Sequence, residues 1–390
     1  MFNREPPTAT TGLILTGGGA RAAYQVGVLK GIASILPRTV YNPFPVICGT
    51  SAGAINALTL AGRAGPLRLR TRKMEAIWAN LRAEQVYRTD ALGVIKNTLK
   101  VALSLFNSGY GVGQPVSLLD NTPLREMLTR LIRFDHLQAA IDAGDLKAVA
   151  LMAMSYESGK SIAFFQADST VKPWQRARRH GLRSELGVEH LMASAAIPSL
   201  FPAVKIDGRF YGDGALRQHK PISPALHLGA DRLLIIGVGN PPVVELPNPD
   251  EIHSPSVAKI VGHMLNSAFL DSMESDLETM RTINQLVAAI PERQRREHNI
   301  SHLRAIETLA ITPSADIDAI AERHIHELPR SIRAFLSVTG ATGRGGGTSA
   351  TSYLLFEPNF CRALIALGER DALAKRSSIE DFFRIASSGE

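Results

Sequence analysis

Ser51 has the neighbours that a nucleophilic serine needs. It is the central residue of Gly49-Thr-Ser-Ala-Gly53, which follows an apolar segment and precedes a run of small residues. A Gly-x-Ser-x-Gly turn between a strand and a helix presents the serine hydroxyl outward, because the glycines keep Cβ atoms out of a crowded turn. The first N–H groups of the helix lie where an oxyanion develops. The pattern predicts attack on a carbonyl carbon, although the pentapeptide alone also fits a plain strand–helix joint.

A second glycine-rich turn precedes this one, at Gly17-Gly-Gly-Ala-Arg-Ala22. Its spacing satisfies a relaxed dinucleotide-binding fingerprint, which also needs an acidic residue about 20 positions further on. The chain has no Asp or Glu between Glu5 and Glu75, and it has no Gly-Lys-Ser/Thr, so neither a dinucleotide site nor a P-loop is indicated. Backbone N–H groups at the start of a helix suit an oxyanion equally well. We therefore expect this turn to bind an oxyanion.

A serine nucleophile also needs a base. All eleven histidines follow Ser51, so the order Ser–Asp–His is available, with His219 six residues after Asp213. Asp213 lies in Gly212-Asp-Gly-Ala215 after a short predicted strand, where its carboxylate could simply form an Asx turn. The residues alone leave these alternatives open.

Strands that alternate with helices must position these residues. Apolar runs and turn signals predict strands at 12–16, 46–48, 146–155, 161–165, 204–206, 209–211, 233–238 and 307–312. Helices are expected after the glycine turn that begins at Gly17, as far as about Ile35, and at about 75–106, 256–289 and 317–338, with a basic surface patch or loop at 176–180. The early strand–helix–strand–helix order predicts an α/β fold with a parallel sheet.

Residues 92–106 form an amphipathic pattern, with Leu92, Ile95 and Leu99 on one face and Lys96 and Lys100 elsewhere. Such a helix usually covers a core, and an alternative is a lid or an interfacial segment near the site. Prolines beyond Gly239 and long helical stretches after them predict two parts. These are a catalytic domain at 11–240 and a mainly helical C-terminal region at 241–390 packed on it. The glycine-rich stretch 339–347 is expected to be a loop.

Composition describes a folded protein with an excess of positive charge. Hydrophobic residues make up 45% of 390 residues, the net charge is +7, and there are only two cysteines, Cys48 and Cys361. With neither a signal-like apolar segment nor a disulfide framework, we expect a cytoplasmic protein, in peripheral contact with an anionic membrane as an option. That option rests on a basic cluster formed by Arg63, Arg68, Arg70, Arg72 and Lys73. No nucleic-acid motif accompanies the cluster, and no metal-ligand spacing is present.

Taken together, the three turns closely resemble the patatin-like phospholipase family. The resemblance rests on the Gly17–Arg21 turn, on Gly49–Gly53 about thirty residues later, and on Asp213-Gly-Ala after Ala193–Pro202. It covers about residues 12–238. Ala22, Ala215 and His219 depart from the family pattern, in which a glycine, a glycine and an asparagine are usual. The two alanines keep the side chain small, while His219 leaves a histidine role open.

The resemblance implies a three-layer α/β/α sandwich with a mainly parallel central sheet, and a serine carboxylic-ester hydrolase that needs no cofactor or metal. It implies Ser51 as nucleophile, Asp213 as base, and an oxyanion hole from three glycine N–H groups (Gly17, Gly18, Gly19). Arg21 would hold that loop or a phosphate, and the supporting glycines of the turns are Gly49, Gly53 and Gly214. The expected activity is that of a phospholipase A or lysophospholipase. The alternative is a non-catalytic patatin-like scaffold that binds a membrane or a partner; head group, acyl chain and oligomeric state are left open.

Overall fold

A ten-stranded mixed sheet runs through the protein, and its central strands are parallel. The computed structural model describes residues 9–91, 93, 95–99, 117–241, 256–300, 303–338 and 348–385. Five neighbouring strands are parallel, in the order β10-β9-β1-β2-β3, and β4, β6 and β5 continue the sheet beyond β3. The strands are β1 (Thr11–Leu15), β2 (Val46–Thr50), β3 (Ala148–Ser155), β4 (Ser161–Ala167), β5 (Trp174–Arg176), β6 (Arg179–Arg183), β7 (Val204–Ile206), β8 (Arg209–Asp213), β9 (Arg232–Ile236) and β10 (Glu307–Ile311).

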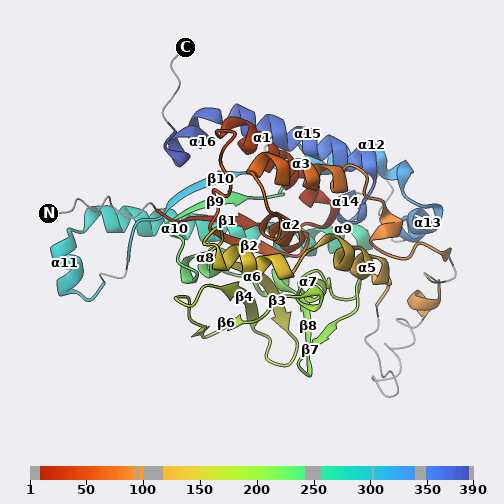
Figure 1. Ribbon diagram of the computed structural model, residues 1–390. Coiled ribbons are helices and arrows are strands. Elements are labelled where there is room, and N and C mark those ends of the chain that lie inside the picture. The colour runs from red at the N-terminus through yellow and green to blue at the C-terminus, as the bar shows by residue number, and fades with distance from the viewer. Residues whose placement is uncertain are drawn as a thin grey trace, which may run out of the picture.

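Helices cover both faces of this sheet, because successive side chains of each strand point to opposite sides. In β1, Leu13 and Leu15 belong to the larger core cluster and Ile14 to the other. The larger cluster packs against α1 (Ala23–Ile35), α2 (Ala52–Ala61), α3 (Leu67–Trp78) and α15 (Pro358–Ala374), and the smaller against α8 (Ser223–His227) and α10 (Ser272–Ala289). Figure 1 shows α1, α3 and α15 together on one face. The expected three-layer α/β/α arrangement is confirmed.

The remaining helices lie mostly around the rim of the sheet and in the C-terminal third. They are α5 (Thr122–Leu131), α6 (Asp135–Asp142), α7 (Val188–Ser194), α9 (Val257–Asn266), α11 (Glu292–Glu297), α12 (Ile317–His324), α13 (Arg330–Val338), α14 (Thr348–Leu354) and α16 (Arg376–Phe383). A π-helical turn, Ser267–Asp271, joins α9 to α10. The predicted helix at 256–289 is therefore present with this one irregularity, while α5 and α6 were not anticipated.

The helix expected at 75–106 is interrupted, since α3 ends at Trp78 and a 3-10 turn follows at Ala83–Gln85. The chain must turn there because Leu81, Val86 and Tyr87 are all buried in the larger core. Within the predicted amphipathic helix, residues 95–99 are helical and residues 92, 94 and 100–106 lie outside the described residues, as do 109–113 and 339–347.

The stretch at 176–180, expected as a surface basic patch or a loop, exposes Arg176 and Arg178 and contains the turn of the β5–β6 hairpin, in which Arg176 pairs with Arg179. Trp174 anchors this hairpin by stacking on Phe165, with ring centroids 5.1 Å apart. The strands of this hairpin were not predicted, because Arg176–His180 contains four basic residues and no apolar alternation.

The C-terminal third is connected to the sheet and to the first helix. β10 extends the sheet beside β9, and α15 packs along α1 (Figure 1). The division of the chain at residue 240 stays a prediction. None of the helices in the described part of the chain is both long and apolar enough to cross a membrane.

Candidate functional site

Ser51 lies in a strained turn between β2 and α2. Its backbone has φ 54° and ψ −128°, a conformation that residues with a side chain rarely adopt. The turn is this tight because α2 starts at the next residue and approaches the end of β1 closely: a Cβ atom on Gly53 would lie 2.3 Å from the Leu15 carbonyl oxygen. Gly49 is equally confined, by the Gly53 carbonyl. The predicted turn is therefore present, with the positive end of the α2 dipole at Ser51.

Ser194 holds this strained turn in place from α7. Its Oγ accepts a hydrogen bond from the Ser51 N–H at 3.0 Å and donates to the Met152 carbonyl at 2.6 Å. Ser194 is completely buried, so both bonds are shielded from water. The side chain thus ties the Ser51 turn to β3.

The sheet register brings Asp213 to Ser51. β4 occupies one edge of β3, whereas β2 and β8 share the other edge. β2 runs parallel to β3 and ends with Thr50 beside Met152, while β8 runs antiparallel and ends with Asp213 beside Ala153. The carboxyl ends of these two strands therefore point toward each other at adjacent positions of β3. Two predicted residues that are 162 positions apart in the sequence meet at this point.

Burial makes Asp213 a stronger base than an ordinary carboxylate. The side chain is fully buried and Oδ1 accepts a hydrogen bond from the Ala215 N–H at 3.0 Å. Burial raises the pKa of Asp213 to about 7, against a smaller downward effect of the Ser51 hydroxyl and the Ala215 N–H. Oδ2 accepts no hydrogen bond from any of the described residues. Gly214 lets the chain pass the Met152 carbonyl directly behind the carboxylate.

The glycine loop lies on the other side of Ser51. A Cβ atom on Gly17 would be 3.1 Å from Ser51 Cβ, and Gly19 lines the same cavity as Ser51. The N–H groups of Gly17 and Gly18 donate no hydrogen bond to any described residue. Gly19 has a φ of 56° and lies against the Tyr353 carbonyl, which leaves no room for a side chain. The loop therefore offers free donors beside the serine.

The side chain of Arg21 leads away from the cavity. It is fully buried, pairs with Asp318 at 2.6 Å, and donates from Nε to Ser352 Oγ at 2.8 Å. Its guanidinium carbon lies 4.3 Å from the centre of the Tyr353 ring. Arg21 was expected to hold either the glycine loop or a phosphate. Its buried contacts with Asp318, Ser352 and Tyr353 fit the first role.

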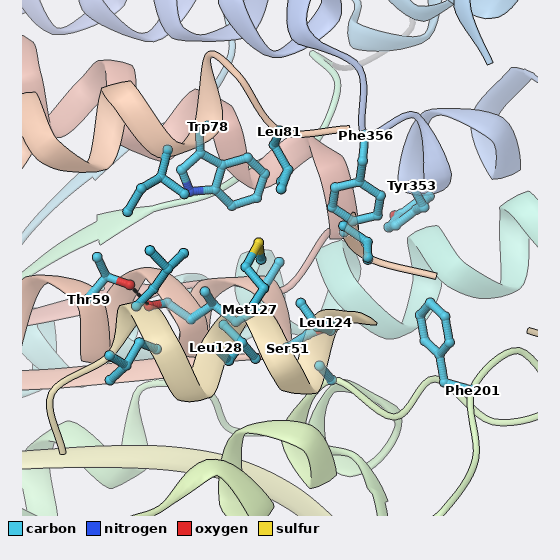
Figure 2. Close-up of a pocket in the computed structure, with 18 of the residues that line it drawn as sticks. Ser51, Thr59, Trp78, Leu81, Leu124, Met127, Leu128, Phe201, Tyr353 and Phe356 are labelled. Carbon is cyan, nitrogen blue, oxygen red and sulfur yellow. Dashed lines mark hydrogen bonds between the residues drawn. The ribbon is translucent and has the colours of Figure 1, made fainter. Parts of the chain in front are cut away.

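An apolar cavity lies along α2, and Ser51 is part of its wall. Ser51, Ile55 and Thr59 lie one turn apart along this helix, a distance of about 12 Å from first to last at 1.5 Å per residue. Figure 2 shows Thr59 at one end of the cavity and Phe201 at the other, with Leu124, Met127 and Leu128 of α5 along one side. The other lining residues are almost all apolar, among them Met74, Trp78, Leu81, Val86, Leu131, Ile132, Ile197, Leu354 and Phe356. The cavity is suited to a hydrocarbon chain.

The histidine alternative has little geometric support. His219 is exposed, and no histidine lines the cavity as far as the described residues extend. Its neighbour Gln218 is buried instead and accepts a hydrogen bond from Thr50 Oγ1 at 2.6 Å. In the part of the chain that the structure describes, no three His, Cys, Asp or Glu side chains form a group that could hold a metal ion.

The basic cluster is only partly available at the surface. Arg70 is buried and donates to the Gly65 carbonyl at 2.7 Å, and Arg68 donates to the Ala33 carbonyl at 2.7 Å. Arg72 and Lys73 are exposed. Arg63 is half-buried, so two of the five basic residues are exposed and available to attract an anionic surface.

Comparisons with known proteins place the chain among phospholipases of one family. A family model described as patatin-like phospholipase matches residues 13–226, which is more than half of the chain. A cGAMP-activated phospholipase of Pseudomonas aeruginosa is 28% identical over 223 residues, covering 55% of this chain and 55% of its own length. A cUMP-AMP-activated phospholipase of Escherichia coli is 47% identical over 49 residues, covering 13% of this chain and 15% of its own. The chain thus spans about half the length of the first relative and less of the second.

Among solved structures, human GIVD cytosolic phospholipase A2 in complex with methyl gamma-linolenyl fluorophosphonate aligns with 98% of this chain and 60% of its own. The TM-score of that alignment is 0.42, at 13% sequence identity.

Proposed function

This chain belongs to the patatin-like phospholipase family, and we propose that it hydrolyses fatty-acyl esters of lipids as a phospholipase A or lysophospholipase. One observation carries the proposal: β2 and β8 end against the same edge of β3, so that Ser51 and the buried Asp213 meet at the wall of an apolar cavity. The names of the two curated relatives, both phospholipases, support the same substrate class.

The acylation step uses Asp213 as the base. Its carboxylate takes the Ser51 proton while Ser51 Oγ bonds to the acyl carbonyl carbon, and the carbonyl electrons move to oxygen. A carboxylate whose pKa is raised to about 7 accepts that proton more readily than one near 4. The tetrahedral intermediate then expels the lysolipid or alcohol, which receives the proton from Asp213. The product left on the protein is a Ser51 ester of the fatty acid.

The glycine loop stabilises the oxyanion in both half-reactions. Free N–H groups of Gly17 and Gly18, with that of Gly19, are the donors nearest to Ser51 on this side. Each such donor is worth about 3–4 kcal/mol in acyl transfer when it is fixed in place. Water, deprotonated by Asp213, then attacks the acyl-enzyme and releases the fatty acid. No step requires a cofactor.

The cavity along α2 would hold the acyl chain. Ser51 and Thr59 mark about 12 Å of it, and nearly all of the side chains between them are apolar. Transfer of a hydrocarbon chain from a membrane to this cavity exposes few of its CH₂ groups to water, so little of the hydrophobic free energy is lost. The proposal therefore includes a lipid substrate and not a small polar ester.

Labelling with a fluorophosphonate, followed by a lipid hydrolysis assay, tests the proposal. We expect labelling of the wild type, none of Ser51→Ala, and strongly reduced labelling of Asp213→Asn. Asp371→Asn is the matched control for a buried aspartate, because Asp371 is also buried but bonds to Tyr24 and Ser314 away from the cavity. Labelling that survives in Asp213→Asn and disappears in His219→Ala would contradict the assigned base.

Two further arms separate the alternatives. The assay is run with and without cGAMP and cUMP-AMP, since both curated relatives are named as activated by such nucleotides. If cleavage requires cGAMP or cUMP-AMP, the result supports the Ser51–Asp213 site and adds that a nucleotide activates it. Vesicle binding that survives in Ser51→Ala, together with no ester cleavage by the wild type under any of these conditions, would instead favour a non-catalytic membrane-binding scaffold.

A further inference from the structure

Arg21 connects the glycine loop to the C-terminal third of the chain. It lies in the 3-10 turn Gly19–Ala22, and its N–H donates to the Gly18 carbonyl at 3.1 Å, so its backbone is part of the loop. Its side chain is fully buried and reaches three C-terminal residues, namely Asp318, Ser349 and Ser352. A charged group without water needs such partners, because an unpaired buried charge is costly.

Asp318 is the centre of this contact. One carboxylate oxygen pairs with Arg21 Nη2 at 2.6 Å, and the other accepts from Asn240 Nδ2 at 2.9 Å. Its backbone N–H is capped by Asp316 at the start of α12. The carboxylate is thus fixed on both oxygens, and it fixes the guanidinium in turn.

The α14 segment completes the contact from a second direction. The Tyr353 ring lies over the guanidinium, its carbonyl abuts Gly19, and its hydroxyl bonds to Asn266 at 2.8 Å. Ser349 Oγ accepts from both Arg21 and Asn266. Movement of α12 or α14 would therefore be transmitted directly to the glycine loop.

From these contacts we infer that Asp318 is a positioning residue for the proposed reaction, acting through Arg21 to keep the N–H groups of Gly17–Gly19 aimed at Ser51. The inference rests on the proposed function, since it assigns to the C-terminal third the task of holding the oxyanion hole. Residues 13–226, which the family model matches, contain Arg21 but not its ionic partner. The catalytic machinery is consequently incomplete without α12 and α14.

The test compares Asp318→Asn with Glu369→Gln. Each substitution removes a carboxylate of the C-terminal third that forms an ion pair with the N-terminal part of the chain. Asp318 pairs with Arg21, and Glu369 pairs with Lys30 at 2.9 Å. Glu369 lies on α15 and does not touch the loop. We expect Asp318→Asn to lower kcat about 10- to 100-fold with KM nearly unchanged, since removing one oxyanion donor costs 10²–10³ and misplacing it costs less. Glu369→Gln should stay within about twofold of the wild type.

A thionoester substrate separates positioning from simple loss of folded protein. Sulfur is larger than oxygen and accepts hydrogen bonds more weakly, so well-placed donors favour the ester over the thionoester. We expect this preference to fall several-fold in Asp318→Asn and to be unchanged in Glu369→Gln. A purely structural role would lower the active fraction and leave the preference as it is.

Two further measurements keep the inference testable. If Asp318→Asn does not fold, Ser352→Ala removes the bond to Arg21 Nε without leaving an unpaired charge, and should lower kcat about 3- to 10-fold. Hydrogen exchange of the peptide that contains residues 17–22 should be faster in Asp318→Asn than in Glu369→Gln, whether or not the protein is active. An active wild type whose Asp318→Asn variant matches it in kcat, ester preference and exchange would overturn the inference. A wild type without Ser51-dependent cleavage would instead count against the proposed function.

Discussion

The proposed reaction centre around Ser51 and its proposed support from the C-terminal third are built in different ways. In the centre, backbone geometry positions each group: the left-handed φ of Ser51, the free N–H groups of the glycine loop, and the meeting of β2 and β8 at β3. In the C-terminal support, side chains position the groups, through the Arg21–Asp318 ion pair and the Tyr353 ring that lies over the guanidinium. Backbone geometry of this kind restricts the sequence to glycine and small residues, whereas a side-chain contact can be made by many residue pairs.

Groups positioned by backbone geometry can be predicted from a sequence, whereas groups positioned by distant side-chain contacts cannot. Glycine spacing around Ser51 and Asp213 indicated both turns, and alternation of strands and helices indicated the layers, so most of the fold and the centre of the site could be predicted. Ser194, Gln218 and Asp318 could not, because no local pattern distinguishes a serine or aspartate with a distant partner from one exposed to water. Short strands such as β5 and the break after Trp78 were missed because tertiary packing decides them.

The largest effect is expected from one added methyl group in the reaction centre. Gly53→Ala would place a Cβ atom 2.3 Å from the Leu15 carbonyl oxygen, so the turn must shift. We expect activity to fall more than about 100-fold and the free energy of unfolding to drop by about 3 kcal/mol, as overpacking typically costs. Activity assays and denaturant unfolding measure both. Gly187→Ala, at a glycine with open space around it and, like Gly53, without a positive φ, controls for the loss of a glycine. If the two substitutions had equal effects, the claim that close backbone packing requires a glycine at position 53 would be wrong.

Side chains that line the cavity should determine which acyl-chain lengths are hydrolysed, without changing Ser51 or Asp213. Ile55→Trp fills the cavity one helical turn from Ser51, and Thr59→Phe narrows it two turns away. We expect Ile55→Trp to lower hydrolysis of long-chain esters at least about 50-fold while a short ester is cleaved normally. Each CH₂ group that can no longer be buried loses its hydrophobic free energy, and these losses add up along a long chain. Thr59→Phe should affect the longest chains alone. A uniform loss for all chain lengths would mean that the acyl chain binds elsewhere.

Asp213 links the reaction centre to pH. As a base it must be deprotonated, so with a pKa raised to about 7 we expect kcat/KM to rise about tenfold per pH unit below pH 7 and to level off above it. The folded protein retains this proton between about pH 4 and 7, where the unfolded chain has lost it, so the free energy of unfolding falls as pH rises through that window.

Asp213→Asn removes this cost. At pH 8 we expect it to be inactive but more stable than the wild type by on the order of 4 kcal/mol, which corresponds to about three pKa units. Thermal unfolding at pH 4 and pH 8 tests this: the stability difference between variant and wild type must grow with pH. A difference that does not change with pH would show that burial does not shift this carboxyl.

The smallest effect is expected at the surface. Replacing Arg72 and Lys73 by alanine should weaken binding to anionic vesicles by up to about fivefold for each residue, as about 1 kcal/mol per basic group predicts. Replacing the exposed pair Arg176 and Arg178 changes the net charge equally and serves as the control. Co-sedimentation at low and high salt measures both. If the two double variants bind alike, net charge and not the location of these residues governs attraction.

The support of Arg21 by Asp318 also determines when activity can first arise. The two residues are 297 positions apart, and β1 pairs with β9 across about 220 positions. At about 5–20 residues per second, synthesis needs roughly 15–60 s to proceed from Arg21 to Asp318. For all but the first 30 residues of that interval the nascent chain already contains Ser51 but lacks Asp318, the proposed partner that orders its glycine loop. On this proposal the site therefore stays incomplete on the ribosome until the C-terminal third has been made.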